Sequence, residues 1–303
     1  MLMNDPLLVI EYYRRGSLSF LITKNYQARG IAMFDIFLAH SKEQKQLIAI
    51  PLTEELRELG FSVWLDRWYI HMGYPIFSTI EKAITESALG IVVISPEFLH
   101  KAWTMHELDC LCNKSEKNDE SSVLLILYQS DIEDVAKYHS HLLYAAYEHA
   151  NIVEHQCANM SIIIARIIAS YYSHILGMKN SENLEEFIEQ INTHKVFSNN
   201  HKTILIELIQ MYIHCYGDIR LKVTSLCNII GYIKGMYRFY IGANNHAIDI
   251  GFNYTQLVLH KKIFAIEPID YEIYIAIETA VHAALMLLCN SGELRNNAEN
   301  DTN

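Results

Sequence analysis

The sequence of 303 residues predicts two parts, an α/β domain built on a doubly wound parallel sheet and an all-α domain that follows it. From residue 33 to residue 178, short apolar runs typical of buried strands alternate with amphipathic segments, and this alternation indicates a parallel sheet covered on both faces. From residue 179 to residue 295, apolar residues recur only at helical spacing. The length is also ordinary for two domains.

The first part contains four clear strand patterns. They lie at residues 34–39, 61–65, 90–94 and 123–128, and a shorter apolar run at residues 151–153 is expected to form an edge strand. Pro51 predicts a kink or a late start of the first helix, and Gly60 predicts its end. Helices are expected at residues 43–59, 76–84, 104–113, 131–147 and 158–176.

Residues 1–32 fit neither pattern. Two interpretations stay open, an extra strand and a flexible leader, and a third is that translation of the native protein starts at Met33. The apolar runs in this stretch are too short for a signal sequence or a membrane span. Residues 161–176 are also too short for a span and include Arg166 and His174, so we expect a buried helix there.

The composition narrows the classes of partner. The formal net charge of -11 argues against non-specific binding to nucleic acid or to an anionic membrane. The six cysteines include no CxxC pair, which indicates reduced thiols in a cytoplasmic protein.

No metal site is predicted, because His139 and His141 are two residues apart, on different sides of a helix, with no cysteine or carboxylate at ligand spacing. The sequence also has no glycine-rich phosphate loop.

The second part shows about five amphipathic segments and no internal repeat, which predicts an irregular helical bundle. Ser181 is placed to cap the first of these segments. Residues 296–303 are polar and are expected to be disordered. This part carries no catalytic pattern of its own.

The residues most suggestive of chemistry follow the third strand. Its apolar run, Ile91–Ile94, ends at Ser95 and Pro96, and a helical segment follows that carries Trp103 and, four residues on, Glu107. Ligands of open α/β sheets bind at the carboxyl ends of the strands. Glu107 is therefore the leading catalytic candidate, although a carboxylate on a helix is more often a solvated surface group.

Four pieces of the first part occur in a specific order and spacing. They are FDIFLAHS at residues 34–41, ELRELGFSVWLD at residues 55–66, GIVVISPEFL at residues 90–99 and WTMHELD at residues 103–109. Together they resemble a Toll/interleukin-1 receptor (TIR) domain of the bacterial type over residues 34–152. The resemblance implies a flavodoxin-like, doubly wound parallel sheet.

The resemblance also implies chemistry on NAD+, because many TIR domains cleave the bond between nicotinamide and ribose, and their catalytic glutamate falls on Glu107. A carboxylate suits this reaction. Nicotinamide is a cationic leaving group that needs no acid, and its departure leaves an oxocarbenium-like ribosyl cation that a carboxylate can stabilise. The products stay open between ADP-ribose and a cyclic ADP-ribose variant. NAD+ is the substrate, and no other cofactor and no metal is implied.

Further positions around Glu107 are implied to bind the substrate. In TIR domains the loop after the second strand, here residues 66–75, flanks the nucleotide pocket and packs against a neighbouring subunit, although Tyr69, Tyr74 and Pro75 depart from the usual acidic or small residues. Simpler roles stay open for each position, such as a turn, a strand cap, a core aromatic or an interface anchor. The expected substrate-binding residues are His40, Ser41, Asp66, Trp68, Gly73, Ser95 and Trp103.

Two functions remain. The first is a cytoplasmic NAD+ nucleosidase of antiphage defence or innate immune signalling. It is expected to be activated when TIR–TIR contacts form a homo-oligomer. By analogy with the way TIR effectors are built, the helical domain is expected to sense an unknown trigger or to drive oligomerisation. The second is a non-enzymatic TIR–TIR interaction or adaptor module, such as a virulence protein that interferes with host signalling. The first is favoured because Glu107 keeps its register with Trp103. Neither function requires nucleic acid or a membrane.

Overall fold

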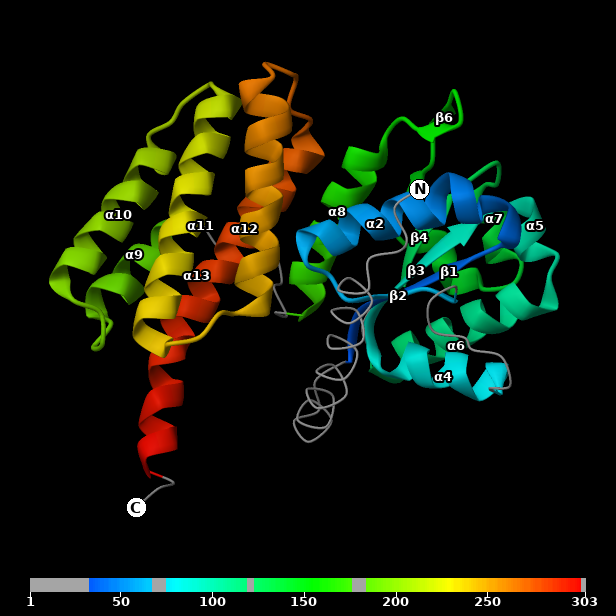
Figure 1. Ribbon diagram of the computed structural model, residues 1–303, viewed down its shortest axis with the longest axis horizontal. Coiled ribbons are helices and arrows are strands. Elements are labelled where there is room, and N and C mark those ends of the chain that lie inside the picture. The colour runs from blue at the N-terminus through cyan, green and yellow to red at the C-terminus, as the bar shows by residue number, and fades with distance from the viewer. Residues whose placement is uncertain (1–32, 67–74, 119–122, 176–183, 301–303) are drawn as a thin grey trace, which may run out of the picture.

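A computed structural model describes residues 33–66, 75–118, 123–175 and 184–300 (Figure 1). The interpretations of residues 1–32, the predicted boundary near residue 178 and the capping role of Ser181 lie outside the described residues.

Five parallel strands form the sheet of the first part, in the order β2-β1-β3-β4-β5. This is the strand order of flavodoxin-like folds, so the predicted doubly wound sheet is confirmed. The order reverses between β1 and β3, where Ile36 of β1 pairs with Val63 of β2 on one side and with Leu89 of β3 on the other. The strands are β1 (Phe34–His40), β2 (Val63–Trp64), β3 (Ser87–Ile94), β4 (Val123–Leu127) and β5 (Tyr147–His149).

Helices cover both faces of the sheet (Figure 1). Successive side chains of β1 point to opposite faces, so Ile36 and Leu38 pack with α2 and α8, whereas Phe37 and Ala39 pack with α4, α5, α6 and α7. Both faces are apolar, as expected of a parallel sheet. The helices are α2 (Ile50–Leu59), α4 (Ile76–Thr85), α5 (Pro96–Leu99), α6 (Ala102–Asn118), α7 (Ile132–Ala136) and α8 (Met160–Ile175).

The first helix starts late, as Pro51 predicts. A 3₁₀ turn (η1, Lys42–Gln44) and a π-helical turn (η2, Lys45–Ala49) precede the regular helix α2, and Pro51 lies in its first turn. Proline has no N–H to donate, and the first turn of a helix is where that donor is not needed. Gly60 ends α2 in the left-handed region with φ of 109°, which a residue with a side chain rarely adopts.

The predicted edge strand at residues 151–153 is wrong. The strand that pairs with β4 is β5, whereas Ile152–Val153 (β6) pairs antiparallel with Gln156–Cys157 (β7) in a separate hairpin. The hairpin turns at Glu154 and His155, which both have positive φ, as two-residue turns of this kind require. The apolar pair misled the prediction because β5 is an edge strand with largely exposed, polar side chains and so lacks an apolar run.

The predicted helix at residues 131–147 is also interrupted. It consists of α7 and a 3₁₀ turn (η3, Ser140–Tyr144), and Tyr147 already belongs to β5. The polar residues 137–141 leave a gap in the apolar stripe between Val135 and Leu142, and a continuous helix would have no buried face there.

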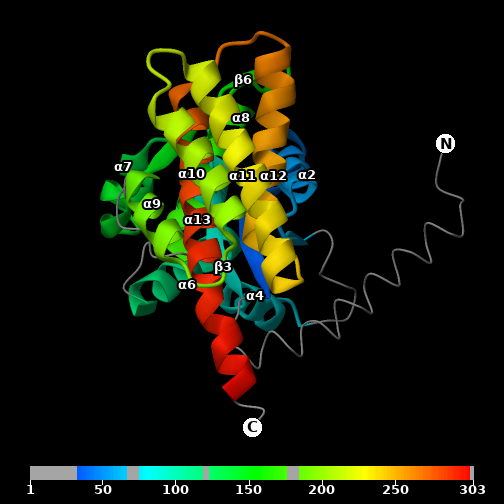
Figure 2. The same ribbon diagram turned by 90° about the vertical axis from the view of Figure 1, so that its left-hand side faces the viewer.

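The second part is all-helical, as predicted, and its five α-helices stand beside the sheet (Figures 1 and 2). Helix α13 continues to Asn300, past residue 296, where the composition predicts that order ends; extending a packed helix costs little because each added residue gains a hydrogen bond. The helices are α9 (Leu184–Thr193), α10 (Asn199–Ile213), α11 (Ile219–Ile241), α12 (His246–Val258), which a π-helical turn (η4, Leu259–Phe264) extends, and α13 (Tyr271–Asn300).

The helix α13 includes one stretch, Tyr271–Ser291, that is long and apolar enough to cross a membrane by composition. More than half of that stretch is buried inside the protein. It lies at the centre of the bundle, where Ile277, Val281 and Leu285 are fully buried. Core packing is thus sufficient to explain its hydropathy.

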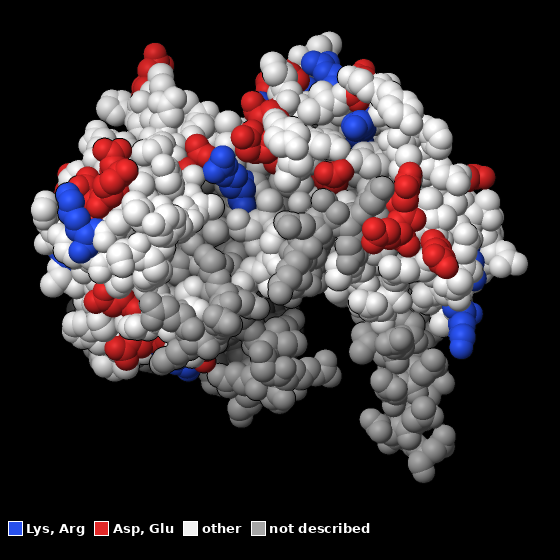
Figure 3. Space-filling view, turned by 180° about the vertical axis from the view of Figure 1, so that it is seen from behind, with Lys and Arg blue, Asp and Glu red and all other residues white. Residues whose placement is uncertain are grey.

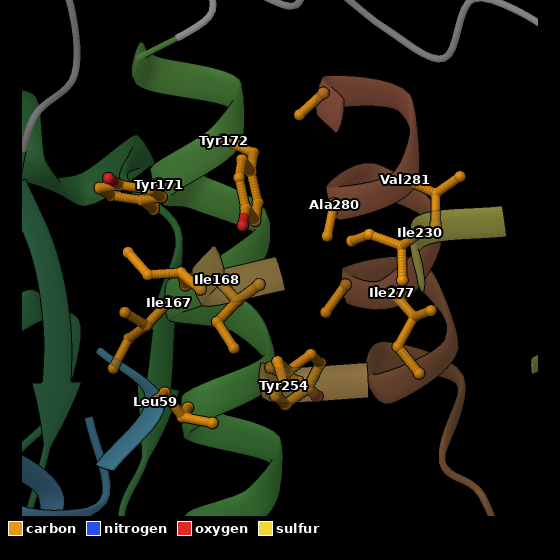
Figure 4. Close-up of a cluster of buried hydrophobic side chains, with 14 of the residues drawn as sticks. Leu59, Ile167, Ile168, Tyr171, Tyr172, Ile230, Tyr254, Ile277, Ala280 and Val281 are labelled. Atoms are coloured by element: carbon orange, nitrogen blue, oxygen red, sulfur yellow. The ribbon is translucent and has the colours of Figure 1, made fainter. Parts of the chain in front are cut away.

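The hydrophobic cores of the two parts are continuous. A single cluster of buried side chains runs from Ile36 in the sheet to Leu288 in α13, and α8 stands between them. Figure 4 shows Ile167 and Tyr171 of α8 on the side of the sheet and Tyr172 directed towards Ala280 of α13. The helix α8 therefore buries two opposite faces, one in each part.

Polar contacts reinforce this junction at α12. The Tyr172 hydroxyl donates to the carbonyl of Ala247 at 2.7 Å, and the Asn253 amide donates to the carbonyl of Leu59 at 3.0 Å. His246 Nε2 lies 2.9 Å from Oδ2 of Asp35, the second residue of β1. These contacts tie α12 to β1, α2 and α8.

Charged side chains are dispersed over the surface. On the face seen from behind in Figure 3, acidic side chains predominate and basic ones stand singly or in small groups. Among the described residues of that face, no basic stripe appears of the kind that follows a nucleic-acid backbone.

Candidate active site

A cleft of about 420 Å³ opens at the carboxyl ends of β1 and β2. It lies at the reversal of strand order, the position at which open α/β sheets bind their ligands. His40 is the last residue of β1, Asp66 lies two residues after β2, and the first turns of α6 supply Trp103 and Glu107. The remaining lining residues are Leu38, Lys42, Lys45, Trp64, Lys101 and Thr104.

Glu107 is buried in this cleft, with 5% of its surface exposed. Because Trp103 lies four residues earlier on the same helix, its indole N–H reaches Glu107 and donates to Oε1 at 2.9 Å. Burial raises the pKa of Glu107 to about 8, the indole hydrogen bond opposes the rise, and the nearby charge of Asp66 adds to it. A positive charge entering the cleft would stabilise the ionised carboxylate.

Asp66 is held by Lys45 and His40. Its Oδ1 atom lies 2.7 Å from Lys45 Nζ and 3.5 Å from His40 Nε2. Burial alone would disfavour the charge of Asp66, but the hydrogen bonds to His40 and Lys45 outweigh it and hold the pKa of Asp66 well below its usual range. The floor of the cleft thus presents one ionised carboxylate next to one that is largely desolvated.

Aromatic rings form one wall of the cleft. Phe77 of α4 packs against Trp103 with 4.7 Å between the ring centroids, and Phe77 is 57% exposed. On the inner side, Trp64 stacks on Phe37 of β1 at 4.7 Å. Such a wall suits a flat heteroaromatic ring.

The structure brings four of the eight predicted site residues together in the cleft: His40, Asp66, Trp103 and Glu107. Two more are placed elsewhere. Ser41 is buried and hydrogen-bonded to Gln44, and Ser95 caps α5 by accepting from the N–H of Phe98 at 3.2 Å. The prediction that Ser41 and Ser95 contact the substrate is thus not supported by their positions, because both hydroxyls are directed into the protein.

The other two predicted residues, Trp68 and Gly73, lie outside the described residues. The sequence analysis missed three lysines of the cleft, Lys42, Lys45 and Lys101. Lys42 and Lys45 lie two and five residues after β1, which was a usable signal, and Lys101 lies two residues after α5.

The folded chain brings together two groups of side chains that could hold a metal ion. Ligand atoms of Cys112, His139 and His141 all lie within 4.8 Å of one another, as do those of Glu81, His106 and Cys110. Each group combines residues from two separate elements, so spacing along the sequence could not indicate it.

Comparison with protein families gives a match of residues 36–158 to the model of the TIR domain. This part of the chain is a bacterial-type TIR domain. The resemblance read from the four sequence pieces is therefore confirmed, and a helical region follows the TIR domain.

Curated relatives of the TIR domain act on NAD+. Over 110 residues, the chain is 36% identical to the NAD(+) hydrolase TcpC of Escherichia coli, and the match covers 36% of each protein. Over 109 residues, it is 34% identical to the 2' cyclic ADP-D-ribose synthase AbTIR of Acinetobacter baumannii, with coverage of 36% of this chain and 40% of the relative. The chain thus spans less than half the length of these relatives.

Among solved structures, the TIR domains of the activated Roq1 resistosome, which recognises the pathogen effector XopQ, match 45% of this chain and 98% of that chain. The sequence identity is 19% and the TM-score is 0.38.

Proposed function

We propose that the TIR domain of this chain cleaves NAD+ at the bond between nicotinamide and ribose, with Glu107 as the catalytic residue. One observation carries the proposal. The only buried glutamate among the described residues lines a nucleotide-sized cleft at the switch point of the sheet, next to Trp103. The names of the relatives, NAD(+) hydrolases and 2' cyclic ADP-D-ribose synthases, support the same reaction.

The chemistry needs little more than this carboxylate. As the glycosidic bond breaks, its electron pair leaves with nicotinamide, which becomes neutral and needs no proton. The positive charge moves to the ribose ring as an oxocarbenium-like cation, and the Glu107 carboxylate stabilises that charge. Water, or a hydroxyl of the substrate itself, then attacks the ribosyl cation and gives ADP-ribose or a cyclic product.

The rest of the cleft suits the other portions of NAD+. We infer that the nicotinamide ring lies against Trp103, which lines the cleft beside Glu107 and packs against Phe77. The pyrophosphate would face the lysines Lys42, Lys45 and Lys101, although Lys45 and Lys101 already pair with Asp66 and Glu43. The ion pair with Asp66 is thus a positioning contact for Lys45.

We also propose that the protein is a cytoplasmic effector of antiphage defence or innate immune signalling, activated by assembly of its TIR domains. Exposed apolar side chains at the start of α4, Ile76 at 46% and Phe77 at 57%, support this, because a second copy could cover them. The six cysteines are all free thiols, which supports the cytoplasm.

The test is to incubate the full-length chain at high concentration with NAD+ and to follow the release of nicotinamide. We expect Glu107→Gln to lower the rate by about a hundredfold or more, because the variant keeps the shape of the side chain but cannot carry the charge. Glu54→Gln, an exposed carboxylate of α2, is the matched control. Equal rates for Glu107→Gln and the unmodified protein would refute the mechanism, and no release at any concentration would favour the non-enzymatic TIR–TIR module.

A further inference from the structure

A second set of reactive side chains lies on α6, one residue before Glu107 and outside the cleft lining. His106 and Cys110 are four residues apart on this helix, so they project from the same side. Glu81 of the neighbouring helix α4 faces them. The proposed cleavage of NAD+ uses none of the three.

The distances within this group match those between ligands of one metal ion. Cys110 Sγ lies 3.6 Å from His106 Nε2, and Glu81 Oε1 lies 3.3 Å from the same nitrogen. In a tetrahedral zinc site with ordinary bond lengths, the sulfur–nitrogen distance is about 3.6 Å and the nitrogen–oxygen distance about 3.4 Å. All three ligand atoms lie within 4.8 Å of one another.

The ligand atoms of these three side chains limit which metal ion the group can bind. Magnesium and calcium require several oxygen ligands, and this group offers one carboxylate. A thiolate with an imidazole and a carboxylate suits a borderline-soft divalent ion such as Zn²⁺. The side chains of Glu81 and His106 are 54% and 33% exposed, so an ion can enter from solvent and keep a water molecule as its fourth ligand.

The surroundings favour a positive charge at this point. Burial raises the pKa of the Cys110 thiol, and the nearby carboxylates Glu81, Asp109 and Glu107 raise it further, so the empty group holds a neutral thiol among acidic side chains. The ring of Phe77 packs edge-on against the imidazole of His106 at 5.4 Å and limits its rotation.

We propose that Glu81, His106 and Cys110 form a binding site for a single zinc-class divalent cation that joins α4 to α6. The ion takes the lone pair of His106 Nε2, a carboxylate oxygen of Glu81 and the sulfur of Cys110. The thiol proton passes to solvent as the metal–sulfur bond forms, so one proton leaves for each thiolate that binds.

The first measurement is a titration of the full-length chain with Zn²⁺ alone by calorimetry, followed by a titration with Co²⁺ monitored by absorption. We expect one tightly bound ion per chain and a thiolate-to-Co²⁺ charge-transfer band. Cys110→Ala should remove the band and weaken Zn²⁺ binding by about a hundredfold, and Glu81→Gln, a change at an exposed side chain, should weaken it by about tenfold.

The matched control is Cys112→Ala on the same helix. Cys112 belongs to the other group, with His139 and His141, and His139 Nε2 is already 2.7 Å from Asp109 Oδ1. This variant should keep the band and the affinity. The absence of saturable Zn²⁺ binding would overturn the proposal and leave an ion pair between Glu81 and His106. Retention of the band in Cys110→Ala, or its loss in Cys112→Ala, would also overturn it. Thermal melting of each variant shows whether it is folded. If Cys110→Ala does not fold, Glu81→Gln still tests the site.

Discussion

The pairing of Trp103 with Glu107 depends on one turn of α6. Spacing of four residues places the indole N–H 2.9 Å from the carboxylate, and the helix keeps both side chains at the cleft without help from a loop. The indole is then both a wall of the cleft and a hydrogen-bond donor to the proposed catalytic group.

We expect Trp103→Phe to separate these two roles. The variant keeps an aromatic ring but loses the N–H, and a hydrogen bond to a charged group contributes about 1.5 kcal/mol or more. The value of kcat/KM for nicotinamide release should fall by about tenfold. Steady-state kinetics with NAD+ would measure this change. Unchanged kcat/KM would mean that the indole acts only as an aromatic wall of the cleft and that its hydrogen bond to Glu107 does not affect the reaction.

The residues around Glu107 show what the sequence could and could not predict about the site. Glu107 was a candidate because it follows the third strand, a local feature, whereas the roles of Trp103, Asp66 and His40 came from the resemblance to TIR domains. Lys42 and Lys45 lie in the irregular turns before α2, whose geometry apolar spacing does not predict. The hydroxyl of Ser95 caps α5, a local role that competes with any contact to a ligand and that the resemblance did not indicate.

Helix α12 approaches α8 closely at Gly251. A Cβ atom added there would lie 2.8 Å from the Tyr172 hydroxyl and 2.9 Å from Ile230 Cδ1, so a side chain has no room. We expect Gly251→Ala to lower the free energy of unfolding by about 1–3 kcal/mol, partly offset by the better helix propensity of alanine. Chemical denaturation would measure the change.

Gly235 of α11 is the matched control for this crossing. It is also helical, but an added Cβ would meet nothing within 4 Å. Gly235→Ala should therefore raise the free energy of unfolding by about 0.5–1 kcal/mol. Equal effects of the two substitutions would show that the close approach of α12 and α8 is not a constraint.

The ion pair between β1 and α12 makes stability depend on pH. Burial disfavours the charge of Asp35, but hydrogen bonds to His246 and Ser62 outweigh it and hold the pKa of Asp35 below 3.8. The hydrogen bond to Asp35 raises the pKa of His246 above 6.5. The contribution of His246 to the free energy of unfolding is complete below the pKa of His246 in the unfolded chain, and it is lost as the pH rises through the raised pKa of the folded protein. The contribution of Asp35 is lost as the pH falls through the lowered pKa of Asp35.

We therefore expect His246→Gln to lower the free energy of unfolding more at about pH 6 than at about pH 8.5. Half of the His246 side chain is exposed, so the difference between the two pH values should not exceed about 1 kcal/mol. Urea denaturation at both pH values would measure it, with the exposed residue His100 changed to Gln as a control. Equal losses at both pH values would exclude a contribution from this ion pair.

Element boundaries were predicted best where apolar patterns were long. The buried strands β1 and β3 and the helix α8 were located because their side chains enter the core at regular spacing. β5 was missed because it gains its position from hydrogen bonds to β4, and backbone pairing leaves no mark on side-chain hydropathy.

At the scale of the whole molecule, the two parts share buried surface on α8. Ile168 and Tyr172 are almost fully buried, and Tyr172 is directed towards α13 (Figure 4). The sequence pattern showed that α8 is apolar on most sides but could not show that the second part covers one of them, because that contact joins residues about a hundred positions apart.

We expect a truncated chain of residues 33–183 to be poorly folded, because removal of the bundle exposes the outer face of α8 to water. Size-exclusion chromatography and binding of a hydrophobic dye would measure this against the full-length chain. A monomeric truncation that unfolds cooperatively would show instead that the TIR domain is independent of the bundle.

The double burial of α8 has a consequence for protein engineering. In a chimera that joins this bundle to a different TIR domain, the bundle would pack against the counterpart of α8 in that domain. The outward side chains of that helix would be suited to contact with water. The graft would have to transplant the outward face of α8 together with the bundle, and the exchangeable module would then begin inside the TIR domain rather than after it.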